Sequence, residues 1–324
     1  MFLKNKSLKS FLKYIIPLVI SVGLCIVLYS GVDFRQIADG LRLCDFCLIV
    51  TALGCNVLAQ IFRAVRWRMQ LRAIGVTPPV GAMLCSVFGT YAVNIVFPRL
   101  GEVWRCAYVA KRQQASFTSV FGSMVADRLA DTLAVFLLAL LTLAVAAGAM
   151  NAFFNSLSVP VNLWWLVTAG FAAIICLALA LIYGKHYPAV ARLRSALVNA
   201  AHGFASIFRM QRPWLWGVFT IAIWGSYFAS MWLFMLAFPP TAHVGIVAVL
   251  VTFVFGSLAM AVPSNGGIGP WQVAIIMSLA GIYGVAQDQA LAFATINLGF
   301  TTLLTIILGF ITFIAIALDR TRTR

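Results

Sequence analysis

Carboxylates and histidines are scarce in this sequence. Its 324 residues contain eight Asp and Glu in total and three His, and charged residues make up 10%. A soluble domain carries about 25% charged residues, so this composition excludes an ordinary soluble protein. Hydrophobic residues reach 63%, and the mean hydropathy is +1.00. The composition therefore predicts an all-α polytopic membrane protein.

Sequence signatures of metal, redox and hydrolytic chemistry are missing as well. His186, His202 and His243 stand apart from one another, and Cys44 and Cys47 form the only CxxC pair. A zinc or redox centre would need a second cysteine pair or a nearby histidine. No nucleophile elbow, phosphate loop or HExxH motif occurs. We therefore expect no cofactor, no metal and no catalytic residue.

Positive charge is the exception, with a formal net charge of +15. The basic residues fall in the short gaps between apolar runs, which is the positive-inside pattern and not a nucleic-acid surface. Placing the lysine-rich residues 1–13 in the cytoplasm puts the arginines of the C-terminal tail there too. This predicts a multi-pass protein of a bacterial-type inner membrane with both termini cytoplasmic. No small-residue cleavage site follows, so the first apolar run is expected to be retained.

Long apolar runs predict about six full spans, since a span needs about 20 apolar residues. These runs cover residues 14–30, 46–62, 117–149, 163–183, 214–238 and 290–318. Two further segments are broken, one at "PRLGE" after 80–97 and one at "PSNGGIGP" between 244–262 and 271–283. We expect both to be re-entrant helical hairpins.

The same order of segments occurs twice: a span, then a broken segment, then an overlong span. This order predicts an inverted repeat within a single domain of residues 1–324. The first copy covers 46–149 and the second 213–324. Residues 1–45 form a first span and outer loop, and 150–212 a connecting span with a basic helix over 184–213 on the membrane surface. The alternative is that each break is only a tight loop between ordinary spans. In transporters built from inverted repeats, the site lies where the broken segments meet.

Charged residues gather in the first copy despite their rarity elsewhere. The six, three of each sign, are Arg99, Glu102, Arg105, Asp127, Arg128 and Asp131. Each charge facing lipid costs about 2.5–3.5 kcal/mol, so they must face the bundle interior, pair, or line a wet cavity. We expect Glu102 to neutralise the arginines on either side of it. One interpretation is an ion-pair clasp, and the other is an anion site, because Arg forks onto phosphate.

A glycine-rich segment and an arginine-rich segment also stand out in the sequence. Glycines in "VPSNGGIGPWQ" allow positive φ and expose amides before a helix, so we assign Asn265, Gly266, Gly267, Gly269 and Gln272 to substrate binding. The arginines of "FRAVRWRMQLRAIG" follow a predicted span, and we interpret them as topology signals that attract anionic lipid. They are Arg63, Arg66, Arg68 and Arg72.

Four segments resemble the transmembrane flippase domain of lysylphosphatidylglycerol synthases and their stand-alone relatives. The segments are "RAVRWRMQLRAIGV", "FPRLGEVWRCAYVAKR", "VADRLADTLAVF" and "VPSNGGIGPWQ". The resemblance runs from about Arg63 to the C-terminus and implies movement of aminoacylated or polyprenyl-linked lipids between leaflets. The soluble aminoacyl-transferase domain of the synthases is absent from this sequence, and many relatives have Glu where this chain has Gln272.

Three hypotheses follow. The first is a lipid flippase in which Arg99 and Arg105 contact a phosphate while Glu102, Asp127 and Asp131 hold the arginines and sense any cationic part. The second is a membrane enzyme acting on a lipid-linked sugar or phosphate. The third is a scaffold for a separately encoded lipid-modifying enzyme. A membrane lipid is the expected partner, nucleic acid is not, and the oligomeric state stays open.

Overall fold

The computed structural model describes residues 34–97, 100–156, 210, 212–262, 264 and 268–322. Two of the predicted spans, 14–30 and 163–183, lie outside the described residues, as does nearly all of the predicted surface helix over 184–213. The described part is helical throughout, with no strand. Four of its helices are long and apolar enough to cross a membrane: Phe46–Ala73, Phe117–Asn151, Pro213–Ala237 and Gln287–Asp319. The prediction of an all-α polytopic membrane protein is confirmed.

The helices follow the predicted order with shifted bounds. The first predicted copy contains α3 (Phe46–Ala73), α4 (Val80–Val96), α5 (Leu100–Arg112) and α6 (Phe117–Ser156). The second contains α9 (Pro213–Ala237), α11 (Ile246–Ala259), α12 (Pro270–Ile276), η2 (Met277–Ile282) and α13 (Gln287–Arg322). Two short helices, α2 (Phe34–Arg42) and α10 (Pro239–Ala242), precede α3 and follow α9. Both breaks predicted from the sequence fall between helices, at 97–99 and 260–269.

Helix α3 is longer than the apolar run that predicted it. Asp45 caps its first turn by accepting from the backbone N–H groups of Cys47 and Leu48 at 2.8 and 3.2 Å. The apolar run ends at Phe62, but the helix continues to Ala73. Arginine and glutamine are good helix formers, so loss of apolar character does not end a helix. The arginines after residue 62 therefore lie on a helix and not in a loop.

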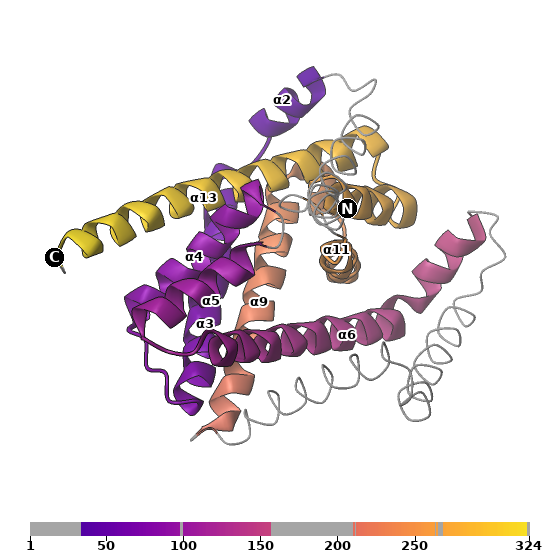
Figure 1. Cartoon of the computed structure of the whole chain (residues 1–324). Helices are drawn as coiled ribbons and strands as arrows, with labels where there is room; N and C mark the ends of the chain where they lie inside the picture. Colours follow the sequence, from indigo (N-terminus) through magenta and orange to yellow (C-terminus); the bar gives the residue numbers. More distant parts are fainter. Residues whose placement is uncertain are drawn as a thin grey trace, which may run out of the picture.

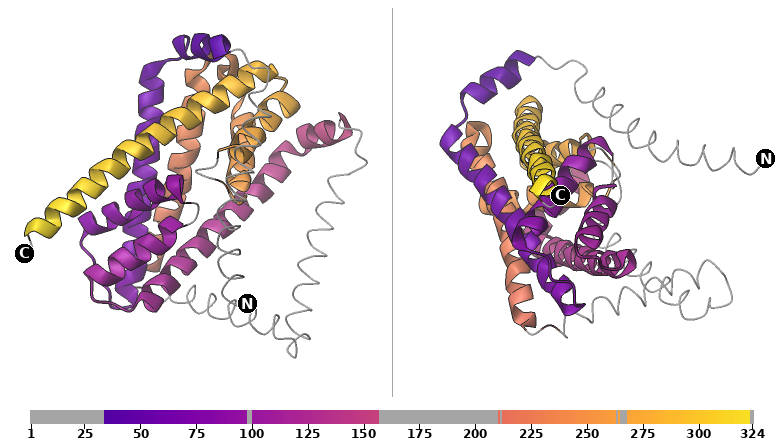
Figure 2. Two further views of the ribbon diagram at one scale, coloured as in Figure 1. Left: turned by 45° about the horizontal axis from the view of Figure 1, so that its top comes forward. Right: turned by 60° about the vertical axis from the view of Figure 1, so that its left-hand side comes forward.

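Helices α3 and α9 pack along each other in opposite directions (Figure 1). At one end the Asp45 N–H donates to the Ala237 carbonyl oxygen at 2.9 Å. Toward the other end Arg66 reaches Thr220, and the rings of Phe62 and Phe219 lie 5.9 Å apart. In the right-hand view of Figure 2 this antiparallel pair lies along one edge of the described helices.

Each of the two hairpins packs on the long helix of the other half. Helix α4 packs against α13, and α11 packs against α6 (Figures 1 and 2). One buried cluster includes Phe234, Phe253 and Phe293 from the second half. Another, which includes Trp67 and Val109, joins α3 to the first hairpin.

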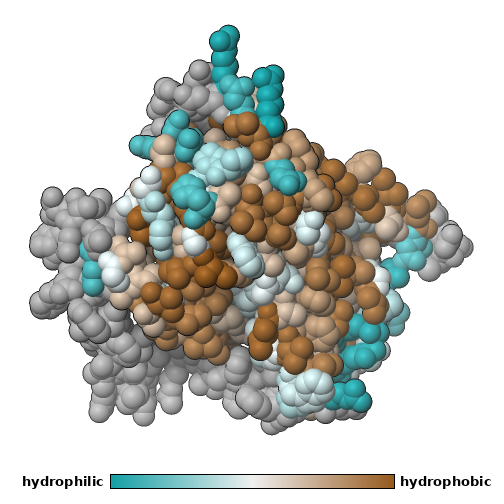
Figure 3. All heavy atoms as spheres, turned by 180° about the vertical axis from the view of Figure 1, so that it is seen from behind, coloured by the Kyte–Doolittle hydropathy of each residue, from teal (hydrophilic) through white to brown (hydrophobic). Residues whose placement is uncertain are grey.

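Apolar side chains also cover much of the outside. Seen from behind, hydrophobic residues form broad areas, with hydrophilic ones gathered mainly toward the edges (Figure 3). The outer face of α13 exposes, among others, Leu303, Ile306, Phe310 and Ile314. Surface of this extent on a monomer marks contact with lipid or protein. It fits the four candidate membrane spans.

In each hairpin, a glycine on the first helix packs against a tryptophan on the second. Gly89 on α4 lies against the ring of Trp104 on α5, so closely that an added Cβ would overlap the ring. Gly256 on α11 lies against Trp271 on α12, where an added Cβ would sit 2.7 Å from the indole Nε1. The two breaks are thus spanned by the same kind of contact, although the sequences around them differ.

Candidate functional site: a buried charge network beside a central cavity

Arg66 is the centre of an ion-pair network between α3 and α6. Its Nε and Nη2 lie 3.0 and 2.7 Å from Oδ1 of Asp127, and Nη2 also lies 2.7 Å from Oδ1 of Asp131. Its Nη1 donates to Thr220 Oγ1 on α9 at 3.1 Å. The side chains of Arg66 and Asp127 are fully buried. The spacing of Asp127 and Asp131 by four residues indeed places both carboxylates on one face of α6.

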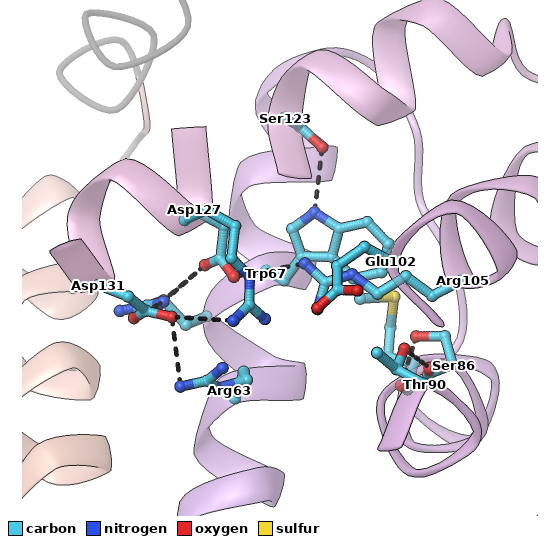
Figure 4. A network of polar contacts seen from close by, with 12 residues as sticks. Arg63, Trp67, Ser86, Thr90, Glu102, Arg105, Ser123, Asp127 and Asp131 are labelled. Carbon is cyan, nitrogen blue, oxygen red and sulfur yellow. Dashed lines mark hydrogen bonds and ion pairs between the residues drawn. The ribbon is translucent and has the colours of Figure 1, made fainter. Parts of the chain in front are cut away.

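Three more arginines surround the same two carboxylates. Arg63 Nη2 lies 3.2 Å from Asp131 Oδ2, and Arg128 Nη1 lies 3.7 Å from the same oxygen. Arg105 Nη2 lies 3.6 Å from Asp127 Oδ2. The network therefore joins four arginines to two aspartates and has an excess of two positive charges. Figure 4 shows Arg63, Asp131 and Asp127 converging on it.

The interpretation that Arg63 and Arg66 attract anionic lipid is wrong, because both side chains are buried in the protein. They are 5% and 0% exposed, whereas Arg72 on the same helix is exposed as expected. Residues 60, 63, 67 and 70 fall on one side of a helix, and in this chain they are Gln60, Arg63, Trp67 and Gln70, all buried. This polar face was visible in the sequence, but it was hidden by ending the predicted helix at residue 62.

Aromatic rings hold the arginines from behind. Arg105 lies over the ring of Trp67 at 4.3 Å from guanidinium carbon to centroid, Arg66 over Trp216 at 5.4 Å, and Arg63 over Tyr227 at 5.7 Å. Trp67 is itself fixed by an N–H bond of 3.1 Å to Ser123 Oγ (Figure 4). Such cation–π contacts gain strength when water is excluded, and they leave the guanidinium charge in place.

A cavity of about 490 Å³ lies next to the network and is lined by both halves of the chain. Its charged lining residues are Arg63, Arg128 and Glu102. Its polar lining comes from α3, α4, α9, α11 and α13, and includes Asn56, Gln60, Tyr91, Asn94, Tyr227, Ser257, Asn297 and Thr301. Apolar residues such as Phe253 and Met260 complete the wall. A concave cavity in which apolar side chains and polar groups converge has the character of a small-molecule site.

The six clustered charges of the sequence separate into two layers around this cavity. Asp127, Asp131 and Arg105 are buried in the network and do not line the cavity, whereas Arg128 and Glu102 do. Arg63, which the sequence reading left out, joins them in the lining. Arg99 lies outside the described residues. The arginines that face the cavity are therefore Arg63 and Arg128, whose Nε atoms are buried without a hydrogen-bond partner in the described part of the chain.

Of the two arginines that Glu102 was expected to neutralise, Arg105 pairs elsewhere and Arg99 lies outside the described residues. The carboxylate next to Arg105 is Asp127, on another helix. Glu102 accepts from the Asn94 side-chain amide, with Nδ2 to Oε2 and Oε1 distances of 3.3 and 3.4 Å. Asn94 Oδ1 in turn accepts from the Gly101 N–H at 2.8 Å, which ties the end of α4 to the start of α5. Glu102 thus presents a carboxylate to the cavity from the turn of the first hairpin.

The glycine-rich break contributes less that can be described. Asn265, Gly266 and Gly267 lie outside the described residues. Gly269 has a φ of +91°, and its N–H donates to Gln272 Oε1 at 3.1 Å. Gln272 is 2% exposed, so its amide caps the start of α12 and does not line the cavity. From the segment 262–272, it is Val262, Ser264 and Trp271 that line the cavity.

The arrangement limits the chemistry of the site. Both aspartates are bound to arginines, and the described residues hold no group of three His, Cys, Asp or Glu that suits a metal ion. A cavity bordered by two partly uncompensated guanidinium groups attracts an anion, and a guanidinium matches phosphate in geometry.

The transmembrane region of lysylphosphatidylglycerol synthases, as a family model, matches residues 14–309, which is most of the chain. The chain belongs to this family. The resemblance noted from the four sequence segments is confirmed, and the cavity lies within the matched region.

A similarity of smaller extent links the chain to the glycosyltransferase AglD of Haloferax volcanii. The two are 28% identical over 105 residues, which is 32% of this chain and 17% of that protein. The chain therefore spans a small part of that relative's length. Membership of the lysylphosphatidylglycerol synthase transmembrane family and this similarity together indicate a function related to membrane lipids.

Proposed function

We propose that this protein moves a phosphate-bearing lipid between the leaflets of a cell membrane. The proposal rests on Arg63 and Arg128, which both face the cavity. Both form ion pairs with the same carboxylate, that of Asp131, whereas Arg66 binds Asp127 and Asp131 together. A phosphate between the two guanidinium groups would supply the missing negative charge. The apolar lining from Phe253, Met260 and Val262 suits the part of the lipid next to its headgroup.

The arrangement of helices supports an inverted repeat, which is the architecture that alternating access needs. α3, α4–α5 and α6 correspond in order to α9, α11–α12 and α13. The corresponding helices α3 and α9 are antiparallel, each hairpin packs on the long helix of the other half, and a Gly–Trp contact closes each hairpin. Rocking of one half against the other would expose the cavity to each side in turn. Cytoplasmic termini and an inner-membrane location remain part of the proposal.

Transport in reconstituted vesicles tests the proposal directly. The probe is a fluorescent phosphatidylglycerol in both leaflets, whose outer fraction is bleached by a membrane-impermeant reductant. Vesicles containing the protein should lose nearly all fluorescence, and empty vesicles about half. The double variant Arg63→Gln, Arg128→Gln should slow the second phase at least about tenfold, because each hydrogen bond to a charged group contributes about 1.5–3 kcal/mol.

The matched control is Arg72→Gln, an exposed arginine on the same helix as Arg63. It should behave like the unaltered protein. All variants must elute as the same species in size-exclusion chromatography before rates are compared. Undiminished transport by a folded double variant contradicts the proposal.

A second function stays open because a relative is named a glycosyltransferase. In that case the cavity would hold a lipid-linked sugar or phosphate for a reaction, by this chain or by a separate enzyme for which it is a scaffold. Lipid analysis of a deletion strain separates these functions. Loss of one lipid species favours an enzyme or scaffold, whereas an unchanged species in the wrong leaflet favours transport, and co-purification identifies a bound enzyme.

A further inference from the structure

The cavity has an uncharged section next to its arginines. Arg63 lies over Tyr227, and this contact marks the charged end. Gln60 comes about one helical turn before Arg63 on α3, and Met231 comes about one turn after Tyr227 on α9. Gln60 and Met231 both line the cavity. Because α3 and α9 are antiparallel, these two steps go in the same direction, about 5.4 Å along the pair. Asn297 of α13 meets Met231 at this level, with Nδ2 4.0 Å from the sulfur.

The polar groups of this section are buried and poorly satisfied. Gln60 and Asn297 are 8% and 5% exposed. Gln60 Oε1 has no hydrogen-bond partner among the described residues, and the Asn297 amide donates to a thioether, a weak acceptor. The indole Nε1 of Trp224, also in the cavity wall, is a buried donor without a partner in the same described part. Gln60 and Asn297 contribute uncharged amides to the cavity lining and Trp224 an indole ring, so this section suits a neutral ligand with hydrogen-bonding groups.

The chemistry of these groups identifies what they would bind. Amides donate and accept, an indole N–H donates, and none of the three carries a charge. A hydroxyl group both donates and accepts, so several hydroxyls on one ligand satisfy all three at once. A cation would instead require carboxylates at this level, and the only carboxylate lining the cavity is that of Glu102 within the described part of the chain. The rings of Trp224 and Tyr227 suit the C–H faces of a sugar or polyol.

We infer that the substrate of the proposed transport is a phosphodiester lipid whose phosphate bears a neutral polyhydroxylated group, such as a glycosyl unit. The phosphate lies between Arg63 and Arg128, and the hydroxyl groups reach Gln60, Asn297 and Trp224. This inference rests on the proposed function, since it concerns the same cavity. The same chemistry occurs in a prenyl phosphosugar and in a glycerophospholipid with a polyol headgroup, and the test separates these sources.

The test measures binding of four probes to the purified full chain in detergent, by quenching of tryptophan fluorescence. The probes are a short-chain prenyl phosphate, the same prenyl phosphate carrying glucose, short-chain phosphatidylglycerol, and short-chain lysyl-phosphatidylglycerol. A glycosylated probe that binds at least about tenfold more tightly than the bare prenyl phosphate supports the inference, because two or more added hydrogen bonds account for that ratio. Tighter binding of phosphatidylglycerol than of the glucosyl probe identifies the polyol lipid as the source.

Two variants locate the effect. Gln60→Leu and Asn297→Leu should each reduce the preference for the glucosyl probe at least threefold while the affinity for the bare prenyl phosphate stays unchanged. Gln70→Leu is the matched control, because Gln70 is a buried amide on the same helix as Gln60 and does not line the cavity. It should leave the preference intact.

Failure of the inference differs from failure of the proposed function. Two results contradict a neutral headgroup but leave phosphate binding intact. One is equal affinity for the bare and glucosyl prenyl phosphates. The other is tightest binding of lysyl-phosphatidylglycerol, with that binding weakened in Glu102→Gln. If no probe binds, or if binding is indifferent to Arg63→Gln, the proposed function is overturned as well. Should Gln60→Leu fail to fold, Asn297→Leu alone decides the result.

Discussion

Arg66 and Asp127 form a fully buried ion pair across 61 residues of sequence, with Arg66 Nη2 2.7 Å from Asp127 Oδ1. The pair joins α3 to α6, and Thr220 of α9 binds the same guanidinium. A charge at this depth is stable only while its partners stay in place. The pair therefore fixes the position of the two cavity arginines that flank it.

Removing one side of this pair should destabilise the protein strongly. We expect Asp127→Asn to lower the free energy of unfolding by about 3–5 kcal/mol, because Arg66 and Arg105 lose a buried counter-charge. The double variant Arg66→Met, Asp127→Leu should lose less free energy of unfolding than the sum of the losses in the two single variants. Chemical unfolding in detergent measures both. Asp39→Asn is the control, since the Asp39–Arg42 pair is exposed and such pairs contribute about 0–1 kcal/mol.

The first hairpin should be intolerant of a methyl group at Gly101. An added Cβ would overlap the Thr90 carbonyl oxygen and lie 2.7 Å from Asn94 Oδ1. We expect Gly101→Ala to lower thermal stability and to displace Glu102 from the cavity. Gly122→Ala serves as control, because that position on α6 has nothing within 4 Å of an added Cβ and a helical Ala is favoured by about 1 kcal/mol. Equal melting temperatures for the two variants would contradict the close approach of α4 and α5.

Glu102 should set the charge preference of the cavity. Replacing Glu102 with Gln keeps an oxygen acceptor for Asn94 and removes the carboxylate from the lining. Binding of a singly negative phospholipid should strengthen about two- to tenfold and become more sensitive to salt. Titration of phosphatidylglycerol at two ionic strengths measures this change. Weaker binding of the anionic lipid would show that Glu102 serves the substrate and not the balance of charge.

The ends of α5 and α13 are linked by an ion pair between Arg112 and Asp319, both partly exposed. This link joins the first hairpin to the long helix of the other half. If the halves move apart during transport, Arg112→Gln should speed that opening by up to about fivefold, the range of a solvent-exposed pair. Cys85 lies nearby on α4, and its maleimide labelling rate in a variant with no other cysteine reports the opening. High salt should raise the labelling rate of Cys85 in the protein that keeps the Arg112–Asp319 pair, and should not raise it in the Arg112→Gln variant.

The sequence by itself determined the membrane class, the order of spans and broken segments within the described residues, and the face shared by Asp127 and Asp131. These follow from composition and from local periodicity, which hydropathy and helix geometry translate directly. The family resemblance also followed from short motifs. The predicted end of the first long helix was wrong, because polar residues that face a protein interior look the same in sequence as polar residues that face water.

Only the tertiary structure decided which arginines meet which carboxylates. Arg63 and Arg66 lie more than 60 residues before Asp127 and Asp131, and their pairing depends on how α3 rotates against α6. It also decided that Arg105 stays behind the cavity, that Glu102 binds Asn94, and that Gln60, Trp224 and Asn297 line the same cavity as Arg63 and Arg128. Distance along the chain carries no information about these contacts, since they arise from packing between helices that are separate in sequence.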